Sequence, residues 1–453
     1  MADRLSDLPD DILRRILHFA PLKEAVSTTA LSRRWRTPLW LSSGAVNRED
    51  HCVVKDISSL QLLSESEGFV TEDFGRDALV TAALAALDAA DVPVTRLTLR
   101  LESDHHDAVE DFMNCNTDDD SCYKNLVEVV FSHRAASRVE EFRLVFKVRT
   151  GYKIGYTVDP DSLPFETLQF LELTNCLGLY RPALIVLPRL STLRLHSCTQ
   201  RLVSLQRAVD GVEIDAPRLR RFRYMGGRLL SLAFTPRPLN LEQVDLHDER
   251  WANKQGLDLA TFWRFARSFT STREMRLSVN HLEEVAVLTE ASRVELLPKF
   301  SRLKCLELHG FYWKNGDTAA VTIANLLRCC HVLCALRISL TAEHQTAVDA
   351  SNKKGPRSRI AQKIMQIPAL GPHHSLKCLQ SSLARVGLQF WRDESYYFGL
   401  KLIEFFAENA MILEEMHVDT KLCKHINDNK TERWNSKRRK LGATCFVVVP
   451  HKR

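Results

Sequence analysis

The sequence lacks any long apolar run. Its most apolar window, near Thr81–Ala90, contains Asp88 and is flanked by Asp77 and Asp91. A transmembrane helix needs about 20 predominantly apolar residues, so no membrane span is predicted. The opening segment, Met1–Asp7, is charged, and the apolar core of a secretory signal does not follow it. We therefore expect no membrane partner, and we expect most of the 12 cysteines to stay thiols in a reducing compartment.

A strong excess of one charge is also missing. The 62 Lys and Arg residues nearly balance the 56 Asp and Glu residues, which leaves a formal charge of +6 over 453 residues. No aromatic stacking motif or nucleic-acid module accompanies this mild charge, so no nucleic-acid partner is expected. A Gly-rich phosphate loop and a G-x-S-x-G nucleophile elbow are absent as well. The sequence therefore assigns no catalytic residue.

Two clusters contain metal-binding residue types without the spacing of a metal site. Cys329-Cys330-His331-x-x-Cys334 gathers its ligands in one place, whereas zinc sites usually use two separated pairs. The acidic residues within 104–111 and 118–120 do not follow the spaced D-x-D-x-D-G pattern of a calcium loop. We expect neither a metal nor another cofactor.

The first forty residues have the pattern of a small helical unit. A helix is predicted to open at Leu8-Pro9-Asp10-Asp11, because proline is tolerated in a first turn and acids favour the positive end of the helix dipole. Apolar residues then recur at helical spacing through Leu17, and a second short amphipathic stretch follows Pro21. A unit of this size cannot easily form a stable core alone. It packs either on the rest of the chain or on a partner.

This segment resembles an F-box, because Leu8-Pro9-x-x-Ile12-Leu13 is followed at the right separation by Leu31-Ser32-Arg33-Arg34-Trp35. The resemblance implies three helices that bind a Skp-family adaptor, which bridges to a cullin and a RING subunit. Pro38 departs slightly from the commonest form, since it lengthens the gap from Trp35 to Trp40. By resemblance, the adaptor contacts are Leu8, Pro9, Ile12, Leu13, Ile16, Leu17, Leu31, Ser32 and Trp35.

A six-residue phrase, apolar-x-x-apolar-x-apolar, recurs along the rest of the chain. Its ten copies are 94–99, 139–144, 168–173, 190–195, 219–224, 241–246, 272–277, 303–308, 333–338 and 413–418. Most intervals are close to the period of leucine-rich repeats, and Cys176 and Cys198 stand where that repeat expects Asn or Cys. An ordinary α/β sheet would not repeat one phrase in this way. The pattern predicts stacked repeats with a parallel sheet on the inner face.

The predicted fold class is therefore α/β: a three-helix F-box and a curved leucine-rich repeat solenoid, with a parallel concave sheet and a helical or irregular convex side. Helices on the convex side are expected within 122–136, 259–268, 285–295 and 319–330. Residues 375–418 are similar to the strand–helix–strand FBD module that follows the repeats in plant F-box proteins. We divide the chain into an F-box (1–41), a connector (42–78), the repeat array (79–374) and an FBD-like cap with a basic tail (375–453).

The residue between the last two apolar positions of each phrase is predicted to point to the concave surface. Arginine is frequent there, and it makes forked contacts to carboxylates and phosphates. An acidic or phosphorylated target segment is one interpretation, and ordinary solvated ion pairs are the other. The predicted concave-face residues are Phe170, Glu172, Arg194, Arg223, Asp245, Arg276, Glu307 and Arg337, with Arg143 and Thr98 in the same column.

A basic run, Ser436–Lys440, lies near the C-terminus. It is either a nuclear import signal or a phosphate-contacting patch, although short basic runs are usually exposed loops. We expect residence in the nucleus, the cytoplasm or both.

The resemblance implies a non-catalytic specificity subunit of an SCF-type ubiquitin ligase, whose repeats bind an unknown target protein. The spaced Cys/His pattern of a RING is missing, so other subunits would supply catalysis. The alternative is a non-degradative scaffold or a small-molecule sensor that uses the adaptor, with a ligand pocket walled by Phe170 and Tyr224.

Overall fold

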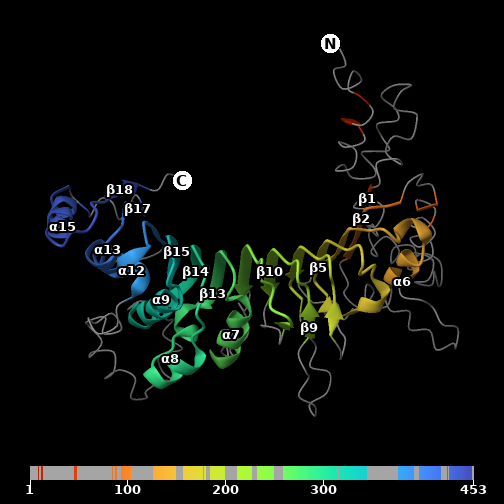
Figure 1. Cartoon of the computed structure of the whole chain (residues 1–453), viewed down its shortest axis with the longest axis horizontal. Helices are drawn as coiled ribbons and strands as arrows, with labels where there is room; N and C mark the ends of the chain where they lie inside the picture. The colour runs from red at the N-terminus through yellow and green to blue at the C-terminus, as the bar shows by residue number, and fades with distance from the viewer. Residues whose placement is uncertain are drawn as a thin grey trace, which may run out of the picture. The chain divides into compact units, whose positions relative to one another are not determined.

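The computed structural model describes residues 9, 12–13, 45–47, 84, 87–88, 93–103, 126–148, 157–176, 178–179, 184–198, 212–226, 232–248, 259–313, 316–343, 376–391, 397–419, 426 and 428–450. Contacts divide the chain into two compact units, and the division falls in and around β10 (Arg221–Gly226), which is labelled in Figure 1. The first unit is residues 1–219, 223–226 and 232–238, and the second is 220–222, 227–231 and 239–453. This division does not test the domain boundaries predicted from the sequence, which stay predictions.

The first unit contains a ladder of parallel strands in chain order. These are β1 (Ala45–Asn47), β2 (Arg96–Ser103), β3 (Glu141–Val148), β5 (Phe170–Thr174) and β8 (Thr192–His196). Each pairs with the next in parallel, and the repeat phrases align in register: Leu97 pairs with Phe142, Phe142 with Leu171, and Leu171 with Leu193. The last two apolar residues of each phrase point into the core, since Leu171, Leu173 and Leu193 have no exposed surface. The predicted parallel sheet is confirmed.

Short strands line the other side of the first unit (Figure 1). They are β4 (Thr157–Val158), β6 (Gly178–Leu179), β7 (Ile185–Val186), β9 (Val212–Asp215) and β11 (Leu232–Phe234). The described helices of this unit are α6 (Leu126–Phe131) and η3 (Arg134–Ala136), between β2 and β3, and η4 (Pro160–Ser162), between β4 and β5. The strands β7, β9 and β11 form a parallel sheet of their own. The prediction of a helical or irregular outer side did not include these short strands, although α6 lies within the predicted helical segment 122–136. Only 22 residues separate Glu172 from Arg194, which leaves room for a short strand and turns but little for a helix.

The described part of the second unit contains seven strands, each parallel to the next in chain order. They are β12 (Gln243–Asp248), β13 (Glu274–His281), β14 (Cys305–Trp313), β15 (Ala335–Glu343), β16 (Arg385–Trp391), β17 (Glu415–Val418) and β18 (Val447–Pro450). Longer intervals, such as the 31 residues from Arg276 to Glu307, make room for helices. Burial alternates along β15 and β16, with Leu336, Ile338, Val386 and Leu388 in the core.

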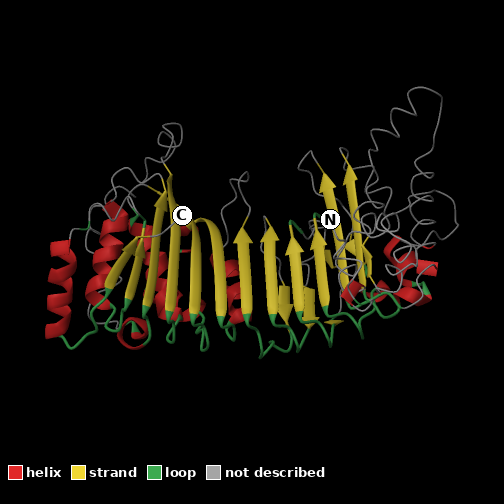
Figure 2. Ribbon diagram, turned by 90° about the horizontal axis from the view of Figure 1, so that it is seen from above, coloured by secondary structure: helices red, strands yellow, loops and turns green. Residues whose placement is uncertain are grey.

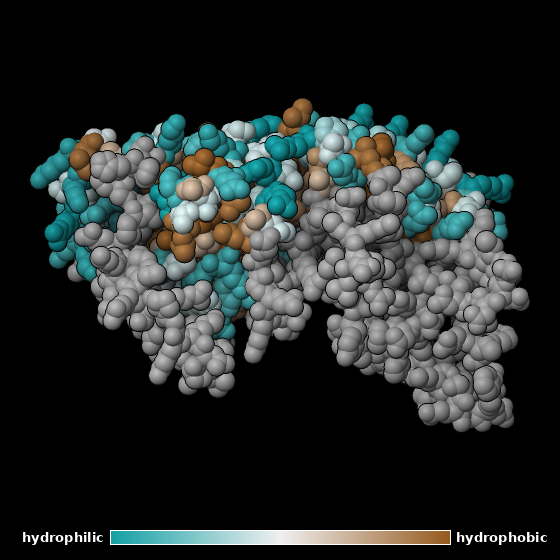
Figure 3. All heavy atoms as spheres, turned by 90° about the horizontal axis from the view of Figure 1, so that it is seen from below, coloured by the Kyte–Doolittle hydropathy of each residue, from teal (hydrophilic) through white to brown (hydrophobic). Residues whose placement is uncertain are grey.

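Helices pack on one face of this second sheet (Figures 1 and 2). They are α7 (Leu259–Ala266), α8 (Glu290–Leu296), α9 (Asp317–Cys329), α12 (Lys377–Ser381), α13 (Tyr397–Asn409) and α15 (Asp428–Lys440), with η5 (Arg267–Phe269) and η6 (Leu282–Val285). All four predicted helical segments contain helix, although α8 starts later than expected. Figure 3 views the helix side, where apolar patches lie among hydrophilic surface. The exposed apolar residues of this unit include Leu239, Leu288 and Val294.

Buried polar groups fix the position of α9. Thr322 Oγ1 donates to the Leu282 carbonyl at 2.6 Å, and Asn325 Nδ2 donates to the Val287 carbonyl at 3.0 Å. Gly316 caps the helix with a φ of 64°, a conformation that glycine adopts without strain. These bonds satisfy backbone carbonyls next to β13 and so order the end of that strand.

The C-terminal part contains the strand–helix–strand order that the FBD resemblance implied, as β16, α13 and β17. The strand β16 also carries a copy of the repeat phrase that the sequence analysis did not count, Leu383-x-x-Val386-x-Leu388. All three of these residues are buried. The phrase thus continues without interruption from the repeats into the cap.

Candidate functional site

The structure describes three of the predicted adaptor contacts. The Pro9 carbonyl accepts hydrogen bonds from the amides of Ile12 (3.1 Å) and Leu13 (3.0 Å), so a helix begins at the predicted place. Ile12 is 39% exposed and free to meet a partner, whereas Leu13 is fully buried. The other predicted contacts lie outside the described residues: Leu8, Ile16, Leu17, Leu31, Ser32 and Trp35.

The predicted column of polar residues is aligned across neighbouring strands. In the first unit, Arg143 pairs in register with Glu172, and Glu172 with Arg194. In the second unit the in-register order is Asp245, Arg276, Glu307, Arg337, Gly387 and His417. These residues alternate with buried ones, so they lie on the sheet face opposite the core, here called the open face. Each unit places one glutamate between two arginines.

In the first unit, Glu172 lies between Arg143 (3.6 Å) and Arg194 (3.5 Å). Phe170 lies two residues earlier on the same strand, and its ring is covered by both guanidinium groups, at 4.8 Å from Arg143 and 5.1 Å from Arg194. His196 Nδ1 is 3.8 Å from the other oxygen of Glu172. We call these residues the Glu172 cluster. Its cations are held by both a carboxylate and an aromatic face.

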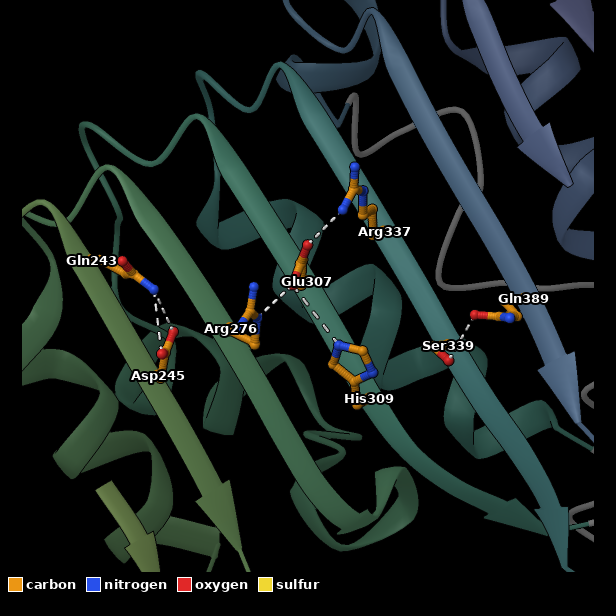
Figure 4. Close-up of polar contacts among 8 residues, drawn as sticks. All are labelled: Gln243, Asp245, Arg276, Glu307, His309, Arg337, Ser339 and Gln389. Carbon is orange, nitrogen blue, oxygen red and sulfur yellow. Dashed lines mark hydrogen bonds and ion pairs between the residues drawn. The ribbon is translucent and has the colours of Figure 1, made fainter. Parts of the chain in front are cut away.

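In the second unit, Glu307 accepts from Arg276 Nε at 2.5 Å and from Arg337 Nη1 at 3.0 Å, using its two oxygens separately. His309 lies 3.9 Å from Glu307 (Figure 4). We call these four residues the Glu307 cluster. The residue two positions before Glu307 is Cys305, so this position supplies no aromatic ring to the cations. Arg337 is 75% exposed, compared with 39% for Arg194.

Electrostatics favour the charged forms of the central pair. The hydrogen bond that Arg276 donates to Glu307 raises the pKa of Arg276, with smaller support from the charges of Glu307 and Asp245. Burial alone would raise the pKa of Glu307, but the hydrogen bond and charge of Arg276 and the charge of Arg337 lower it overall. Burial lowers the pKa of His309 despite the nearby carboxylate. His309 is therefore mostly neutral at pH 7 and can both donate and accept a hydrogen bond.

Two further residues predicted for the concave face, Asp245 and Arg223, belong to neither cluster. Asp245 accepts from the side chain of Gln243, at 3.2 and 3.3 Å, and from no arginine in the described part of the chain. Arg223 is half-buried on β10 and makes no ion pair with another described residue. The structure therefore groups Glu172 with Arg194 and Phe170, and groups Glu307 with Arg276 and Arg337, but leaves Arg223 apart.

Two residues assigned to the concave surface are buried. Tyr224 is 1% exposed, because it holds the last apolar position of its phrase. It does not wall an open-face pocket with Phe170, and that prediction is wrong. Thr98 belongs to the aligned column but is only 2% exposed.

The open face of the second unit also has an aromatic end, which was not predicted. Phe311 pairs in register with His281 on one side and with Thr341 on the other, and Thr341 pairs with Trp391. Trp391 is 42% exposed and Trp313 is 37% exposed. The signal was present, because the alternation that begins at Leu306 continues beyond the repeat phrase through Trp313. We call Phe311, Trp313 and Trp391 the aromatic end.

The basic run near the C-terminus is the last turn of α15, so its interpretation as an exposed loop is wrong. Arg438 is 2% exposed and donates to the carbonyls of Ala407 (2.8 Å), Met411 (3.2 Å) and Thr444 (2.7 Å). It thereby satisfies carbonyls at the C-terminal end of α13, which lack partners within that helix. Lys437, in contrast, is exposed and pairs with Glu408.

The cysteine cluster is apolar in its surroundings. Cys329 and Cys330 are buried, and burial raises the pKa of the Cys329 thiol to about 12. Within the described residues, no three His, Cys, Asp or Glu side chains gather as metal ligands. Within the same residues, no helix combines the length and apolarity that a bilayer crossing requires.

Comparison with known proteins identifies the N-terminal segment. Residues 5–37 match the F-box domain family. The chain is similar to an FBD-associated F-box protein of Arabidopsis thaliana, with 54% identity over 52 residues, which is 12% of this chain and 27% of that protein. It is also similar to an F-box/FBD/LRR-repeat protein (54% over 41 residues) and to another FBD-associated F-box protein (56% over 39 residues) of the same plant.

Each of the last two matches covers 9% of this chain and 9% of the relative. The matched stretches thus span about a quarter of a relative's length at most. The chain therefore contains an F-box domain, and the plant proteins that it resembles over these short stretches are named as F-box, FBD and LRR-repeat proteins.

Proposed function

We propose that this protein is the substrate-recognition subunit of an SCF-type ubiquitin ligase. The observation that carries the proposal is the F-box match at residues 5–37, since F-box domains generally bind Skp-type adaptors. In this proposal the segment folds as three helices on the adaptor, which connects it to a cullin and a RING subunit. The exposed Ile12 is one contact, and the other predicted contacts complete the surface.

The strand ladder then serves as a leucine-rich repeat solenoid that holds the target. Its in-register parallel strands and recurring buried phrase support this assignment. Holding a target near the charged conjugating enzyme makes an encounter local, so no residue of this chain needs to do covalent chemistry. The open face supplies arginines that suit an acidic or phosphorylated target segment.

Retention of a purified Skp-family adaptor by the full chain tests the first half of the proposal. The variant combines Leu8→Ala, Pro9→Ala and Trp35→Ala. The matched control combines Leu239→Ala, Leu288→Ala and Val294→Ala, three exposed apolar residues of the second unit. We expect the wild type and the control to retain the adaptor and the F-box variant to lose it. Equal retention by all three proteins would refute adaptor binding through this segment.

Target turnover tests the second half. If the adaptor is retained and some proteins accumulate when the chain is removed, the ligase function stands. If the adaptor is retained and nothing accumulates, the chain acts as a non-degradative scaffold.

We also propose residence in the nucleus, the cytoplasm or both. Import through the basic run can be separated from folding, because Arg438 alone of that run is buried. A fluorescent fusion carrying Lys437→Ala, Arg439→Ala and Lys440→Ala keeps the buried Arg438. Loss of nuclear signal from this fusion would support import through the run, and an unchanged distribution would exclude it.

A further inference from the structure

The open face of the second unit has two chemically different ends joined by polar residues. The Glu307 cluster forms one end, and the aromatic end forms the other. Between them, His309, Ser339 and Gln389 occupy one in-register row across β14, β15 and β16. Ser339 and Gln389 share a hydrogen bond of 3.4 Å (Figure 4). This row offers donors and acceptors to a peptide backbone laid along the strands.

The cationic end has spare capacity for an anion. Glu307 is a single negative charge shared by two arginines. Arg276 also feels the charges of Asp245 and Glu274, so the unbalanced positive charge lies on the Arg337 side. A guanidinium carries five N–H donors, and Arg337 uses one nitrogen, Nη1, on Glu307. Gly387 is the in-register neighbour of Arg337, and its missing side chain leaves room for the stem of Arg337, whose Cγ would lie 3.3 Å from an added Cβ.

The aromatic end presents flat apolar surface that is only partly covered. Trp391 and Trp313 expose more than a third of their surface, and Phe311 is half-buried. The Trp313 backbone amide donates to Glu283 Oε1 at 3.1 Å and fixes the end of β14, and the His281 ring packs beside the Trp313 ring with centroids 5.3 Å apart. Held aromatic rings of this kind are common anchors in protein interfaces.

The strand spacing sets the distance between the two ends. Arg337 and Thr341 are four residues apart on β15, which is about 13 Å along a strand. Trp391 is in register with Thr341 on the neighbouring strand. A ligand that reaches both ends therefore needs an anion and a large apolar group about 13 Å apart. In an extended peptide, side chains four positions apart are separated by this distance and point to the same side.

We propose that this face binds an extended segment of the target in which a phosphorylated or acidic residue and an aromatic residue stand four positions apart. The anion pairs with Arg337, and the aromatic ring packs on Trp391. This inference rests on the proposed function, because it names the target class that the ligase subunit would recognise. Both a phosphoryl group and a carboxylate supply the required anion, and the probes below separate them.

Labelled peptides with a Gly/Ser background test the proposal against the full chain by fluorescence polarisation. Each peptide carries one tryptophan and one phosphoserine, glutamate or serine, at a separation of two, three, four or five positions. We expect the four-position peptide with an anion to bind best. Separations of three and five should bind about tenfold more weakly, because the two side chains then point to opposite sides. A peptide with serine in place of the anion should also lose binding. Whichever of the glutamate and phosphoserine peptides has the higher affinity identifies the preferred anion.

Matched variants locate the binding. Arg337→Gln and Trp391→Ala should each weaken the four-position peptide about tenfold. Arg194→Gln, in the Glu172 cluster, and Leu239→Ala, an exposed apolar residue elsewhere in the second unit, should leave its affinity unchanged. Thermal melting confirms that the variants fold.

The proposal is overturned if no peptide binds, if affinity does not depend on separation, or if Arg194→Gln weakens binding as much as Arg337→Gln. Adaptor retention is measured on the same preparations. Retained adaptor without peptide binding defeats this inference alone, whereas peptide binding without adaptor defeats the ligase function alone.

Discussion

The Glu172 and Glu307 clusters have the same order of charges on the same column of their sheets, yet they differ in how their arginines are held. In the first unit, Phe170 lies under both guanidinium groups, and the arginines are less exposed than their counterparts in the second unit. In the second unit, Cys305 occupies the place of the ring, and Arg276 and Arg337 extend into solvent. The two clusters thus differ at the position two residues before the glutamate, which is Phe170 in one and Cys305 in the other.

This difference shows that an Arg–Glu–Arg pattern does not by itself define a binding surface. In the Glu172 cluster the cations are already occupied by an anion and a ring, which suits a structural role. In the Glu307 cluster the same charges remain accessible beside an aromatic end. The interpretation of the column as ordinary ion pairs fits the first unit well, and the interpretation as a target contact fits the second better.

The largest effect on stability is expected at Arg438, which is more deeply buried than the arginines of the two clusters. Arg438 donates to three carbonyls and lies over the Phe446 ring. Arg438→Met should leave the Ala407 and Thr444 carbonyls without this donor and lower the free energy of unfolding by about 3–5 kcal/mol. Arg439→Met, on the exposed side of the same turn, should change it by less than about 0.5 kcal/mol. Urea denaturation measures both. Equal destabilisation would mean that the carbonyls find other partners.

The second prediction concerns Glu283, which accepts a hydrogen bond from the Trp313 amide. Glu283 thereby supports the aromatic end, which lies beside the Glu307 cluster and has no counterpart described beside the Glu172 cluster. Burial raises the pKa of Glu283 from its ordinary value of 4.5 to about 7. The folded state therefore binds this proton more tightly than the unfolded state does, and stability falls as pH rises from about 4.5 to about 7. Glu283→Gln should remove this loss and stabilise the protein by about 1–3 kcal/mol at pH 8.

At pH 4 the Glu283→Gln variant and the wild type should be nearly equal in stability, since the carboxyl is then protonated in both states. Thermal melting at the two pH values checks this. A stabilisation that is the same at pH 4 and pH 8 would assign the effect to something other than ionisation.

Removing the central carboxylate compares the two clusters directly. Glu172→Gln should cost about 1–2 kcal/mol, because its partners are partly buried and lose their counter-charge. Glu307→Gln should cost less than about 1 kcal/mol, because its partners are exposed and solvated. The same Glu307→Gln change should strengthen binding of the phosphoserine peptide, since it frees both arginines. A larger loss of stability for Glu307→Gln than for Glu172→Gln would contradict our assignment of a structural role to the Glu172 cluster and a binding role to the Glu307 cluster.

Sequence reasoning predicted the parallel strands and the aligned column, because a period-two alternation within a recurring phrase determines which side chains share a face. It failed where neighbours in space decide the outcome. Phe170 and Cys305 occupy equivalent places, but only the folded sheet shows two guanidinium groups over one of them. The burial of Arg438 could not be predicted either. A run of Lys and Arg residues indicates a solvated segment, and only the folded structure shows that the end of α13 packs against this arginine.

The short outer strands of the first unit could have been found. Ile185-Val-Leu187-Pro188-Arg189-Leu190 and Ile214-Asp-Ala216-Pro217-Arg218-Leu219 repeat one pattern, with alternate apolar residues before a proline. The alternation predicts a strand, and the proline ends it before the next phrase begins.

The smallest expected effect on stability comes from exchanging the residue that distinguishes the clusters. Cys305→Phe places a ring two positions before Glu307, as Phe170 stands before Glu172. Both guanidinium groups of the Glu307 cluster should then pack on this ring, with a change in stability of at most about 1 kcal/mol. Because the anion would have to displace that packing, affinity for the four-position phosphoserine peptide should fall severalfold. Cys305→Leu controls for size without a π face and should retain most of the affinity. If Cys305→Phe binds as well as the wild type, the ring is not what closes the Glu172 cluster, and the partly buried setting of Glu172 must hold its arginines instead.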